Sequence, residues 1–467
     1  MEKTARPSYS FSALLRGLKP SELENSFRSQ PSLRRDFAWL SYRQRGLVIN
    51  LIKNNLLGGL LTAWDNLDQP AKFRILQDLQ AVDLKLVRQN IQLHRRYLES
   101  EGRDSSSNCA QIKGPLDLPV KEDIPTLTAL DAALLKRLSD LGKVYKENGH
   151  IGLLVMAAGS GSRLGRGPKA LVKVDGYRTF IQIAAEDVLK ASQKAGRRLP
   201  LFVMVTPSNA EDIKVHFTAN RNFGLRSEQV NFFLELDRLP RIYQDGTLAL
   251  DANNHRIDFY PTGHGYVLKG IKTQIAKSCR ERGIKTLLIR NIDNLGATIS
   301  DKSYDEVLGH HLSSGRGITV ELVKPRTLVN PATGEEISAD RGGGVFSLNG
   351  RNVIVELFAV PAQLQERGKF NPFNTSNMTI DLDAIDDIDP LQLAWYITRK
   401  SAGPRANDDR YQFEQLLGDA THQKKTNFVV VEREGPDGRF LPVKTPQDLE
   451  YSARVFGLME KAKTTLL

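Results

Sequence analysis

Cysteine is scarce in this sequence, which contains only Cys109 and Cys279 among its 467 residues. Two cysteines provide neither a disulfide framework nor the paired spacing of a zinc site, and a reducing compartment is the default for such a chain. Long apolar runs are missing as well. No stretch approaches the length of a membrane span, and residues 1–20 lack the apolar core of a signal peptide. We therefore expect a cytoplasmic protein with no membrane partner.

A recognised nucleic-acid module is also missing, although the formal net charge is +11. Such an excess could serve nucleic acid or an anionic membrane surface, and it could equally serve small polyanionic ligands such as a triphosphate and a sugar phosphate. The basic residues are spread along the chain and do not alternate with aromatic residues in one motif. We therefore expect no nucleic-acid partner. With 40% hydrophobic residues, the chain can form a sizeable core.

The most informative stretch runs from Ile151 to Asp175. Residues 151–156 are apolar throughout, which is typical of a buried parallel strand. Small residues follow, and these let the backbone come close to a ligand and present N–H groups to an anion. They are Ala157, Ala158, Gly159, Ser160, Gly161 and Ser162. Arg163 and Lys169 then add two cations, so the stretch predicts a loop that binds the phosphates of a nucleotide.

Three other interpretations of this loop are weaker. In a dinucleotide-binding fingerprint the third glycine would fall on Leu164, and Gly165 is one place late. A P-loop would need Gly-Lys-Ser or Gly-Lys-Thr after the glycines, and none follows. An ordinary turn between a strand and a helix needs neither Arg163 nor the pair Pro168 and Lys169.

Strands and helices alternate after this loop. We expect helices over 129–146, 179–195 and 211–219, and further strands over 201–205, 230–234, 287–289, 319–324 and 353–357. This order predicts a doubly wound, mostly parallel, Rossmann-like α/β sheet. Ligands of such sheets bind at the carboxyl ends of the strands, where the loop at Gly159 falls. We expect helices in residues 1–103. We expect a hairpin or an excursion from the sheet in residues 325–339, and a loop with a short helix in residues 401–427.

A second polar cluster follows the strand at residues 287–289. Asn291, Asp293 and Asn294 come at its carboxyl end. A carboxylate opposite a triphosphate loop suits Mg²⁺, which takes one or two carboxylates together with phosphate oxygens and water. The alternative is a turn closed by an asparagine or aspartate side chain. The acidic run at residues 381–389 is typical of a solvated surface and predicts no metal site.

Five motifs occur in a recognisable order: GSGSRLG at 159–165 followed by Pro168-Lys169, PTGHG at 261–265, NIDNLGAT at 291–298, FNTSN at 373–377 and FLPVK at 440–444. With them, residues 150–450 resemble the UTP-dependent sugar-1-phosphate uridylyltransferases of the UDP-glucose/UDP-N-acetylglucosamine pyrophosphorylase superfamily. The resemblance implies an N-terminal helical region and linker at 1–110, a nucleotidyltransferase core at 111–425 and a C-terminal segment at 426–467 that carries a phosphate-binding lysine.

The resemblance also implies a reaction, in which UTP and a sugar 1-phosphate give a UDP-sugar and pyrophosphate. The motifs favour glucose 1-phosphate. The alternatives are N-acetylglucosamine 1-phosphate or galactose 1-phosphate as the substrate, or a non-catalytic nucleotide-sugar sensor or scaffold that acts through residues 1–103. The implied catalytic cations are Arg163, Lys169 and Lys444, and the implied Mg²⁺ ligand is Asp293. Nucleotide contacts are implied for Ala158, Gly159, Ser160, Gly161, Gly263 and His264, and sugar contacts for Asn291, Gly343, Glu356, Asn374 and Asn377.

Three features depart from the family pattern. The C-terminal β-helix of eukaryotic-type UDP-glucose enzymes is not expected here. Leu236 stands where a glutamine usually contacts uracil, with Glu235 beside it. A carboxylate can accept a hydrogen bond from uracil N3–H, but it cannot donate to O4, so the choice of base is open. The N-terminal helical region is longer than in the UDP-glucose branch and is more similar to the other branch. The oligomeric state also stays open.

Overall fold

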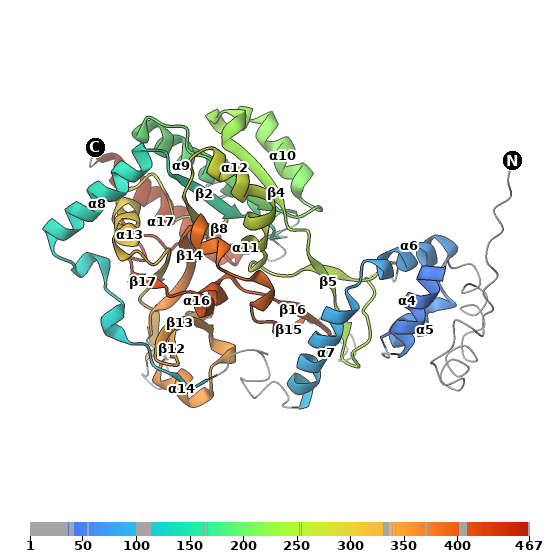
Figure 1. Cartoon of the computed structure of the whole chain (residues 1–467). Helices are drawn as coiled ribbons and strands as arrows, with labels where there is room; N and C mark the ends of the chain where they lie inside the picture. The colour runs from blue at the N-terminus through green and yellow to red at the C-terminus, as the bar shows by residue number, and fades with distance from the viewer. Residues whose placement is uncertain are drawn as a thin grey trace. The chain divides into compact units, whose positions relative to one another are not determined.

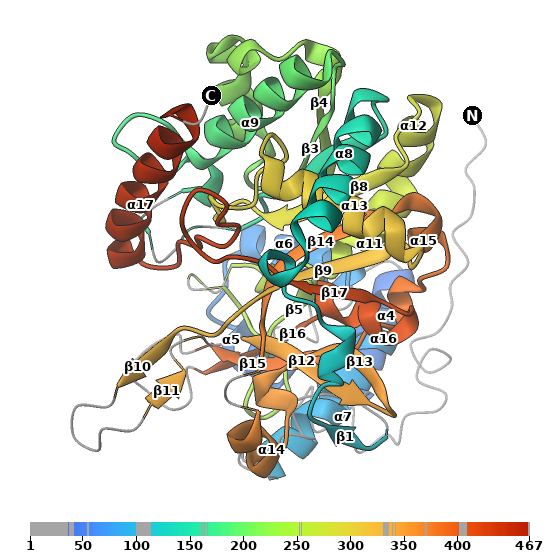
Figure 2. The same cartoon turned by 90° about the vertical axis from the view of Figure 1, so that its left-hand side faces the viewer.

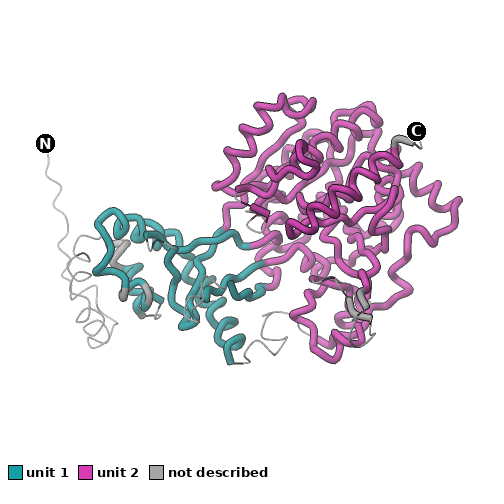
Figure 3. The backbone as a smooth tube through the Cα atoms, turned by 180° about the vertical axis from the view of Figure 1, so that it is seen from behind, with its two compact units in different colours: residues 1–108, 238–262, 395–414 teal, residues 109–237, 263–394, 415–467 magenta. Residues whose placement is uncertain are grey.

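The computed structural model describes residues 36, 42–53, 56–99, 114–159, 161, 164–165, 167–251, 253, 255–329, 336–338, 340, 342–368, 371–400 and 409–465. The chain divides into two compact units (Figure 3). Unit 1 comprises Met1–Asn108, Arg238–Thr262 and Trp395–Glu414, and unit 2 comprises Cys109–Asp237, Gly263–Ala394 and Gln415–Leu467. No helix in these described ranges combines the length and the apolar character needed to cross a membrane.

A parallel sheet forms the first half of unit 2 (Figure 1). Its order is β4 (Val230–Leu234), β3 (Leu201–Val205), β2 (Ile151–Met156) and β8 (Thr286–Asn291), and all three pairings are parallel. Every residue of β2 and β3 is buried. Strands covered on both faces read as continuous apolar runs, and this is why the sequence predicted them. The expected α/β class and these four strands are confirmed.

The other half of the sheet is mixed in direction. The long strand β14 (Phe373–Asp381) runs antiparallel to β8 and to β9 (Ile318–Val323), and β17 (Asn427–Val430) pairs in parallel with β9. A hairpin of β12 (Gly343–Leu348) and β13 (Arg351–Glu356) joins β14 through β12, and β1 (Leu116–Asp117) closes that edge. The C-terminal segment thus supplies a strand to the core sheet and belongs to the same compact unit.

Helices cover the sheet on both faces. Successive side chains of a strand point to opposite faces, so the apolar strands present an apolar surface on each face that helices can cover. From β2, Leu153 and Val155 point into one apolar cluster with α9 (Phe180–Ala195), α10 (Ala210–Ala219), α13 (Lys302–Ser314) and α17 (Pro446–Thr465). Leu154 and Met156 point into a second cluster with α11 (Tyr266–Gly270), α12 (Ala276–Glu281) and α15 (Leu382–Asp386). Helix α9 begins where the sequence predicts, with Thr179 accepting a hydrogen bond from the N–H of Gln182.

The hairpin expected at residues 325–339 is also present. Strands β10 (Thr327–Val329) and β11 (Glu336–Ser338) pair antiparallel with each other. Figure 2 shows this hairpin projecting away from the central sheet.

Unit 1 combines the N-terminal helices with two distant segments. The helices are α4 (Tyr42–Lys53), α5 (Gly58–Trp64), α6 (Gln69–Gln80) and α7 (Leu84–Glu99). The strands are β5 (Arg238–Pro240), β6 (Ile242–Tyr243), β7 (Phe259–Pro261), β15 (Tyr396–Lys400) and β16 (Arg410–Glu414). Asp78 of α6 forms a 2.7 Å ion pair with Arg256, and the ring of His94 on α7 lies 4.6 Å from that of Tyr411. The helices therefore pack on segments that follow them by well over a hundred residues.

The expected loop over 401–427 is wrong for its middle part. Residues 410–414 form β16, which pairs with β15 and with β6. Strand β15 directly precedes the range 401–427, but β6 is a distant segment of the sequence, and the local pattern did not reveal the strand between them. The short helix expected in this range is present as α16 (Ala420–Gln423).

Two glycines allow α8 (Ala132–Glu147) and α13 to pack backbone against backbone. A Cβ on Gly309 would lie 1.9 Å from the carbonyl oxygen of Leu138, and one on Gly142 would lie 2.1 Å from that of Asp305. Neither position has room for a methyl group, and a backbone carbonyl inside a helix cannot move aside cheaply.

Replacing one of these glycines tests the contact. We expect Gly309→Ala to lower the free energy of unfolding by about 3 kcal/mol, because the added methyl group must push the two helices apart. Gly457→Ala is the matched control. Gly457 lies inside α17 with no atom within 4 Å of its Cβ position. It should gain about 0.5–1 kcal/mol from the better helix propensity of alanine. Urea denaturation measures both, and equal effects at the two positions would contradict the packing argument.

Candidate active site

The loop after β2 folds back on itself. The N–H of Lys169 donates to the carbonyl oxygen of Gly159 at 3.1 Å. Gly161 has φ +62°, and a Cβ there would lie 3.0 Å from the carbonyl oxygen of Gly167, so this turn requires glycine. Gly159 is exposed, with no atom within 4 Å of its Cβ position. Its backbone is therefore accessible, and its contact with a nucleotide stays a prediction.

Ala158 is half-buried between Ala157 and Gly159, just after the end of β2. Ser160 and Arg163, to which the sequence assigns contacts with the nucleotide phosphates, lie outside the described residues. Their roles stay predictions.

Three predicted residues from distant parts of the chain meet at one carboxylate. Asp293 follows β8, Lys169 opens the short helix η4 (Lys169–Leu171), and Lys444 lies just before α17. The Nζ of Lys444 lies 2.8 Å from Oδ2 of Asp293, and the Nζ of Lys169 forms an ion pair with the same oxygen. The side chain of Lys444 is 51% exposed, whereas those of Lys169 and Asp293 are 14% and 5% exposed. One ammonium group thus faces solvent and the other lies deeper.

The two lysines determine the charge of Asp293. Burial alone would raise the pKa of its carboxyl group, but Lys444 and Lys169 outweigh burial, and the pKa lies below its usual value. The group is therefore an anion at neutral pH. It holds two ammonium groups, which repel each other, at a single point.

Asp293 also suits the predicted Mg²⁺. Its second oxygen, Oδ1, is buried and has no hydrogen-bond partner among the described residues. The described part of the chain holds no group of three or more His, Cys, Asp or Glu side chains that could bind a metal. A protein that offers one carboxylate and leaves the other positions to phosphate oxygens and water matches the usual binding of Mg²⁺ to nucleotides. The residues present therefore fit the ion.

A short backbone pairing fixes Asp293 next to Lys444. The N–H of Val443 donates to the carbonyl oxygen of Asp293 at 3.1 Å, and the N–H of Leu295 donates to that of Leu441 at 3.1 Å. The side-chain oxygen of Asn294 accepts from the N–H groups of Gly296 and Leu441 at 3.1 and 2.8 Å. Asn294 therefore closes a turn, which is the alternative that the sequence allowed for this cluster, while Asp293 remains available.

The predicted contacts to the nucleotide come from a tight turn before α11. Gly263 has φ +95°, and the Nδ1 of His264 accepts a hydrogen bond from the N–H of Leu417 at 3.0 Å. This bond places the proton of the neutral ring on Nε2, which can donate to a phosphate or a ribose. The side chain of Leu236 is 55% exposed, whereas Glu235 is buried at 4%. The two residues at the position where the family resemblance implies contact with the base thus differ in exposure as well as in charge.

Three of the predicted sugar contacts lie on neighbouring strands. Gly343 of β12 pairs with Glu356 of β13, and a Cβ on Gly343 would lie 2.8 Å from the Oε1 of Glu356. The carboxylate thus lies directly over the glycine. Asn374 follows Phe373, which pairs with Gly344 of β12. Asn291 ends β8 and is half-buried. The sugar roles of all these residues stay predictions.

Asn377 is the most buried of the residues that the sequence assigns to the sugar. Its side chain is 0% exposed and its amide contacts protein groups, and its sugar role stays a prediction. Its Nδ2 donates to the Oε2 of Glu321 at 3.3 Å and to the carbonyl oxygen of Arg439 at 3.2 Å, and its Oδ1 accepts from Asn294 at 3.0 Å. A bulge in β14 between Asn374 and Met378 changes the register at this point. The amide of Asn377 therefore joins β9, the Asn294 turn and the Arg439 segment through these hydrogen bonds.

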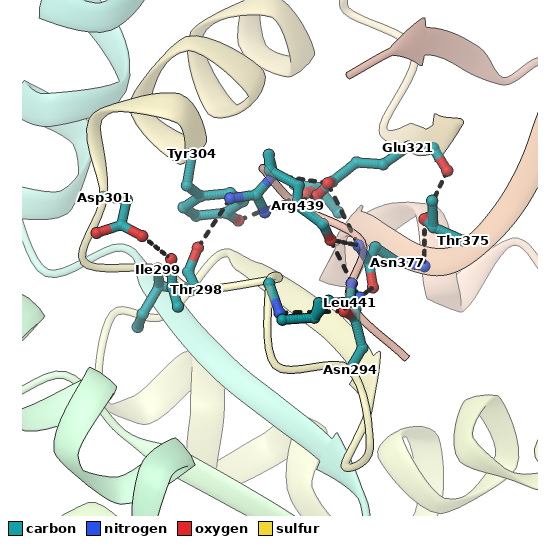
Figure 4. A network of polar contacts seen from close by, with 12 residues as sticks. Asn294, Thr298, Ile299, Asp301, Tyr304, Glu321, Thr375, Asn377, Arg439 and Leu441 are labelled. Atoms are coloured by element: carbon teal, nitrogen blue, oxygen red, sulfur yellow. Dashed lines mark hydrogen bonds and ion pairs between the residues drawn. The ribbon is translucent and has the colours of Figure 1, made fainter. Parts of the chain in front are cut away.

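The sequence reasoning missed a buried ion pair beside this site. Figure 4 shows Arg439 meeting Glu321, and both side chains are 0% exposed. Glu321 is the charged residue of a buried strand whose other residues are apolar apart from Thr319, and Arg439 directly precedes the FLPVK motif. A carboxylate inside a continuous apolar strand is a usable signal, because it demands a buried partner.

Comparison with known proteins gives matches over most of the chain. A family model described as UTP–glucose-1-phosphate uridylyltransferase matches residues 90–462. The UTP–glucose-1-phosphate uridylyltransferase of Saccharomyces cerevisiae is 27% identical over 374 residues, which is 76% of this chain and 67% of the yeast protein.

Solved structures are similar in fold. A uridine diphosphate N-acetylglucosamine pyrophosphorylase from Trypanosoma brucei aligns with a TM-score of 0.63 at 23% identity, over 88% of this chain and 85% of that one. A UDP-glucose pyrophosphorylase from Leishmania major, crystallised as a mutant, aligns with a TM-score of 0.58 at 23% identity, over 82% and 78%. At this level of identity the likeness confirms the α/β fold.

The charge on Asp293 should be visible in the pH dependence of stability. The pKa of its native carboxyl group is lowered, so the charge stabilises the fold above the unfolded value of ~3.9 and ceases to do so as the pH falls through the native value. Asp293→Asn should therefore unfold more easily than the wild type at about pH 6, and the difference should shrink as the pH falls below about 4. Urea denaturation across this range measures the difference. A constant difference would contradict the assignment.

Proposed function

Because the chain belongs to the UTP–glucose-1-phosphate uridylyltransferase family, we propose that it makes a UDP-sugar and pyrophosphate from UTP and a sugar 1-phosphate. The observation that carries the proposal is the meeting of Lys169 and Lys444 at Asp293, next to an open glycine loop. Both substrates are polyanions that repel each other, so a site for their reaction needs converging cations. The cytoplasmic location expected from the scarcity of cysteine is part of this proposal.

The chemical step is an in-line displacement at the α-phosphorus of UTP. An oxygen of the sugar 1-phosphate forms the new P–O bond, and the bond between the α-phosphorus and the bridging oxygen to the β-phosphorus breaks. Pyrophosphate leaves with that electron pair. The nucleophile is already an ionised phosphate, so no general base is needed. Positioning and charge neutralisation therefore supply most of the rate enhancement.

The lysines divide this work. The backbone at Gly159 receives the triphosphate, and Lys169, the deeper cation, holds it by the β- and γ-phosphates or by the α-phosphate as charge builds. Lys444 is half-exposed and holds the sugar phosphate against the α-phosphate. Asp293 keeps both ammonium groups in place before the substrates arrive, so little reorganisation is needed during the reaction.

Asp293 would hold Mg²⁺ through its available oxygen, with phosphate oxygens completing the coordination. The ion would neutralise charge on the triphosphate and orient it, as divalent cations do in phosphoryl transfer.

Glucose 1-phosphate is the preferred acceptor in this proposal. The support is the set of motifs shared with the UDP-glucose branch and the identity to the yeast relative. N-acetylglucosamine 1-phosphate is the alternative, since a pyrophosphorylase for that sugar aligns with a higher TM-score than the Leishmania enzyme. The two sugars differ at C2. Galactose 1-phosphate, which differs at C4, is the third candidate.

The first test is to remove each cation. We expect Lys169→Ala and Lys444→Ala each to lower kcat by roughly 10²- to 10³-fold, by analogy with the loss of one transition-state hydrogen-bond donor. Pyrophosphate release measures this. Lys136→Ala is the control, since the side chain of Lys136 is 77% exposed and forms an ion pair with Asp140 within α8. Near-normal rates in both site variants would refute the assignment.

The second test is a substrate panel, in which glucose, N-acetylglucosamine and galactose 1-phosphates are each combined with UTP, TTP and ATP. We expect the highest kcat/KM for UTP with glucose 1-phosphate, and activity that disappears with EDTA and returns with Mg²⁺. Multiple turnovers would exclude a sensor or scaffold, which binds without turning over. Efficient use of ATP would show that Glu235 and Leu236 do not select uracil. Full activity in EDTA would refute the requirement for Mg²⁺.

A further inference from the structure

The buried ion pair between Arg439 and Glu321 is tied to the site by more than charge (Figure 4). The Nε and Nη2 of Arg439 donate to the two oxygens of Glu321 at 2.6 and 2.9 Å, which is a bidentate contact. Its Nη1 donates to the carbonyl oxygen of Thr298 at 3.0 Å, and its guanidinium lies 5.0 Å from the ring centre of Tyr304. The guanidinium thus connects the core strand β9 to the loop that carries Asp293.

The backbone of Arg439 is held as firmly as its side chain. Its carbonyl oxygen accepts from Nδ2 of Asn294 at 3.1 Å and from Nδ2 of Asn377 at 3.2 Å. Gly296 lies so close that a Cβ there would be 2.8 Å from the carbonyl carbon of Arg439. Residues 439–443 therefore run along residues 293–296 in one fixed register, and Lys444 is the next residue.

Stability alone does not account for this pair. Removing two charges from water costs several kcal/mol, and buried pairs can often be replaced by apolar residues without loss. The planar guanidinium group of Arg439 donates to three fixed acceptor oxygens. This geometry fixes the direction of the backbone at residue 439, which an apolar side chain cannot do. Here that backbone leads to Lys444, whose ammonium group must lie within hydrogen-bond distance of Asp293.

We propose that Arg439 is a positioning residue of the transfer reaction, which acts through Lys444 by fixing the register of residues 439–444 against the Asp293 loop. Glu321 is its charge partner, and Asn294 and Asn377 lock the same segment. The proposal rests on the proposed function, because it assigns Lys444 a part in the rate.

A double-mutant cycle tests this inference. Arg439→Met, Lys444→Ala and the double variant are compared with the wild type by pyrophosphate release over a range of UTP concentrations. We expect Arg439→Met to lower kcat by roughly 10- to 100-fold with the KM for UTP within about twofold, because the loop at Gly159 is untouched. The double variant should be no slower than Lys444→Ala alone, since Arg439 acts through that lysine. Arg439→Lys should recover part of kcat.

Two controls separate positioning from stability. Thr286 lies at the end of β8 that is opposite to Asn291 and the Asp293 loop. Its side chain is 0% exposed, and its hydroxyl donates to Asp381 at 2.6 Å. Thr286→Val should lower the unfolding temperature and leave kcat unchanged. If Arg439→Met does not fold, the Glu321→Gln/Arg439→Met variant, which removes both charges, takes its place in the cycle.

The outcomes are distinct. Losses in Arg439→Met and Lys444→Ala that multiply in the double variant would overturn the positioning role, as would a full kcat with only a lower unfolding temperature. A wild-type protein that forms no UDP-sugar would instead refute the proposed function.

Discussion

The ammonium groups of Lys169 and Lys444 share one carboxylate oxygen of Asp293. The strands of unit 2 bring these three residues together. Strands β2 and β8 are parallel neighbours, so their carboxyl ends bring the Lys169 loop and Asp293 to the same edge of the sheet. Lys444 comes from the C-terminal segment, which pairs with the residues around Asp293. Without Asp293 the two cations would repel each other, and without the cations a buried aspartate would be costly. Each group is stabilised only in the presence of the others.

The local parts of this arrangement were predictable from sequence. Apolar runs identify β2, β3 and β8, because strands buried on both faces show no alternation. Glycines and cations identify the loop at Gly159, and a carboxylate after a core strand identifies Asp293. These signals are contained within a few residues. They placed Lys169 and Asp293 at the same edge of the sheet, whereas Lys444 was assigned only through the resemblance of FLPVK to the family motif.

Features that depend on contacts between distant segments could not be predicted from such local patterns. Arg439 and Glu321 are far apart in sequence; the carboxylate of Glu321 within an apolar strand indicates a buried partner, but no local pattern identifies Arg439 as that partner. Asn377 lies in a motif with a second asparagine, Asn374, and the bulge in β14 between Asn374 and Met378 sets the register at which the amide of Asn377 meets Glu321 and Arg439. Strand β16 is polar in part and exists because β15 and β6 lie on either side of it. Pairing of this kind is a property of the fold, so a sequence pattern does not specify it.

The place of β17 in the sheet has a consequence for synthesis. Until residues 427–430 leave the ribosome, the outer edge of β9 has no partner strand, and an open edge of apolar residues invites association with other chains. A nascent chain that stops short of residue 444 also has its polyanion site only half assembled. Such a chain therefore exposes an unpaired strand edge and lacks one of the two cations that surround Asp293.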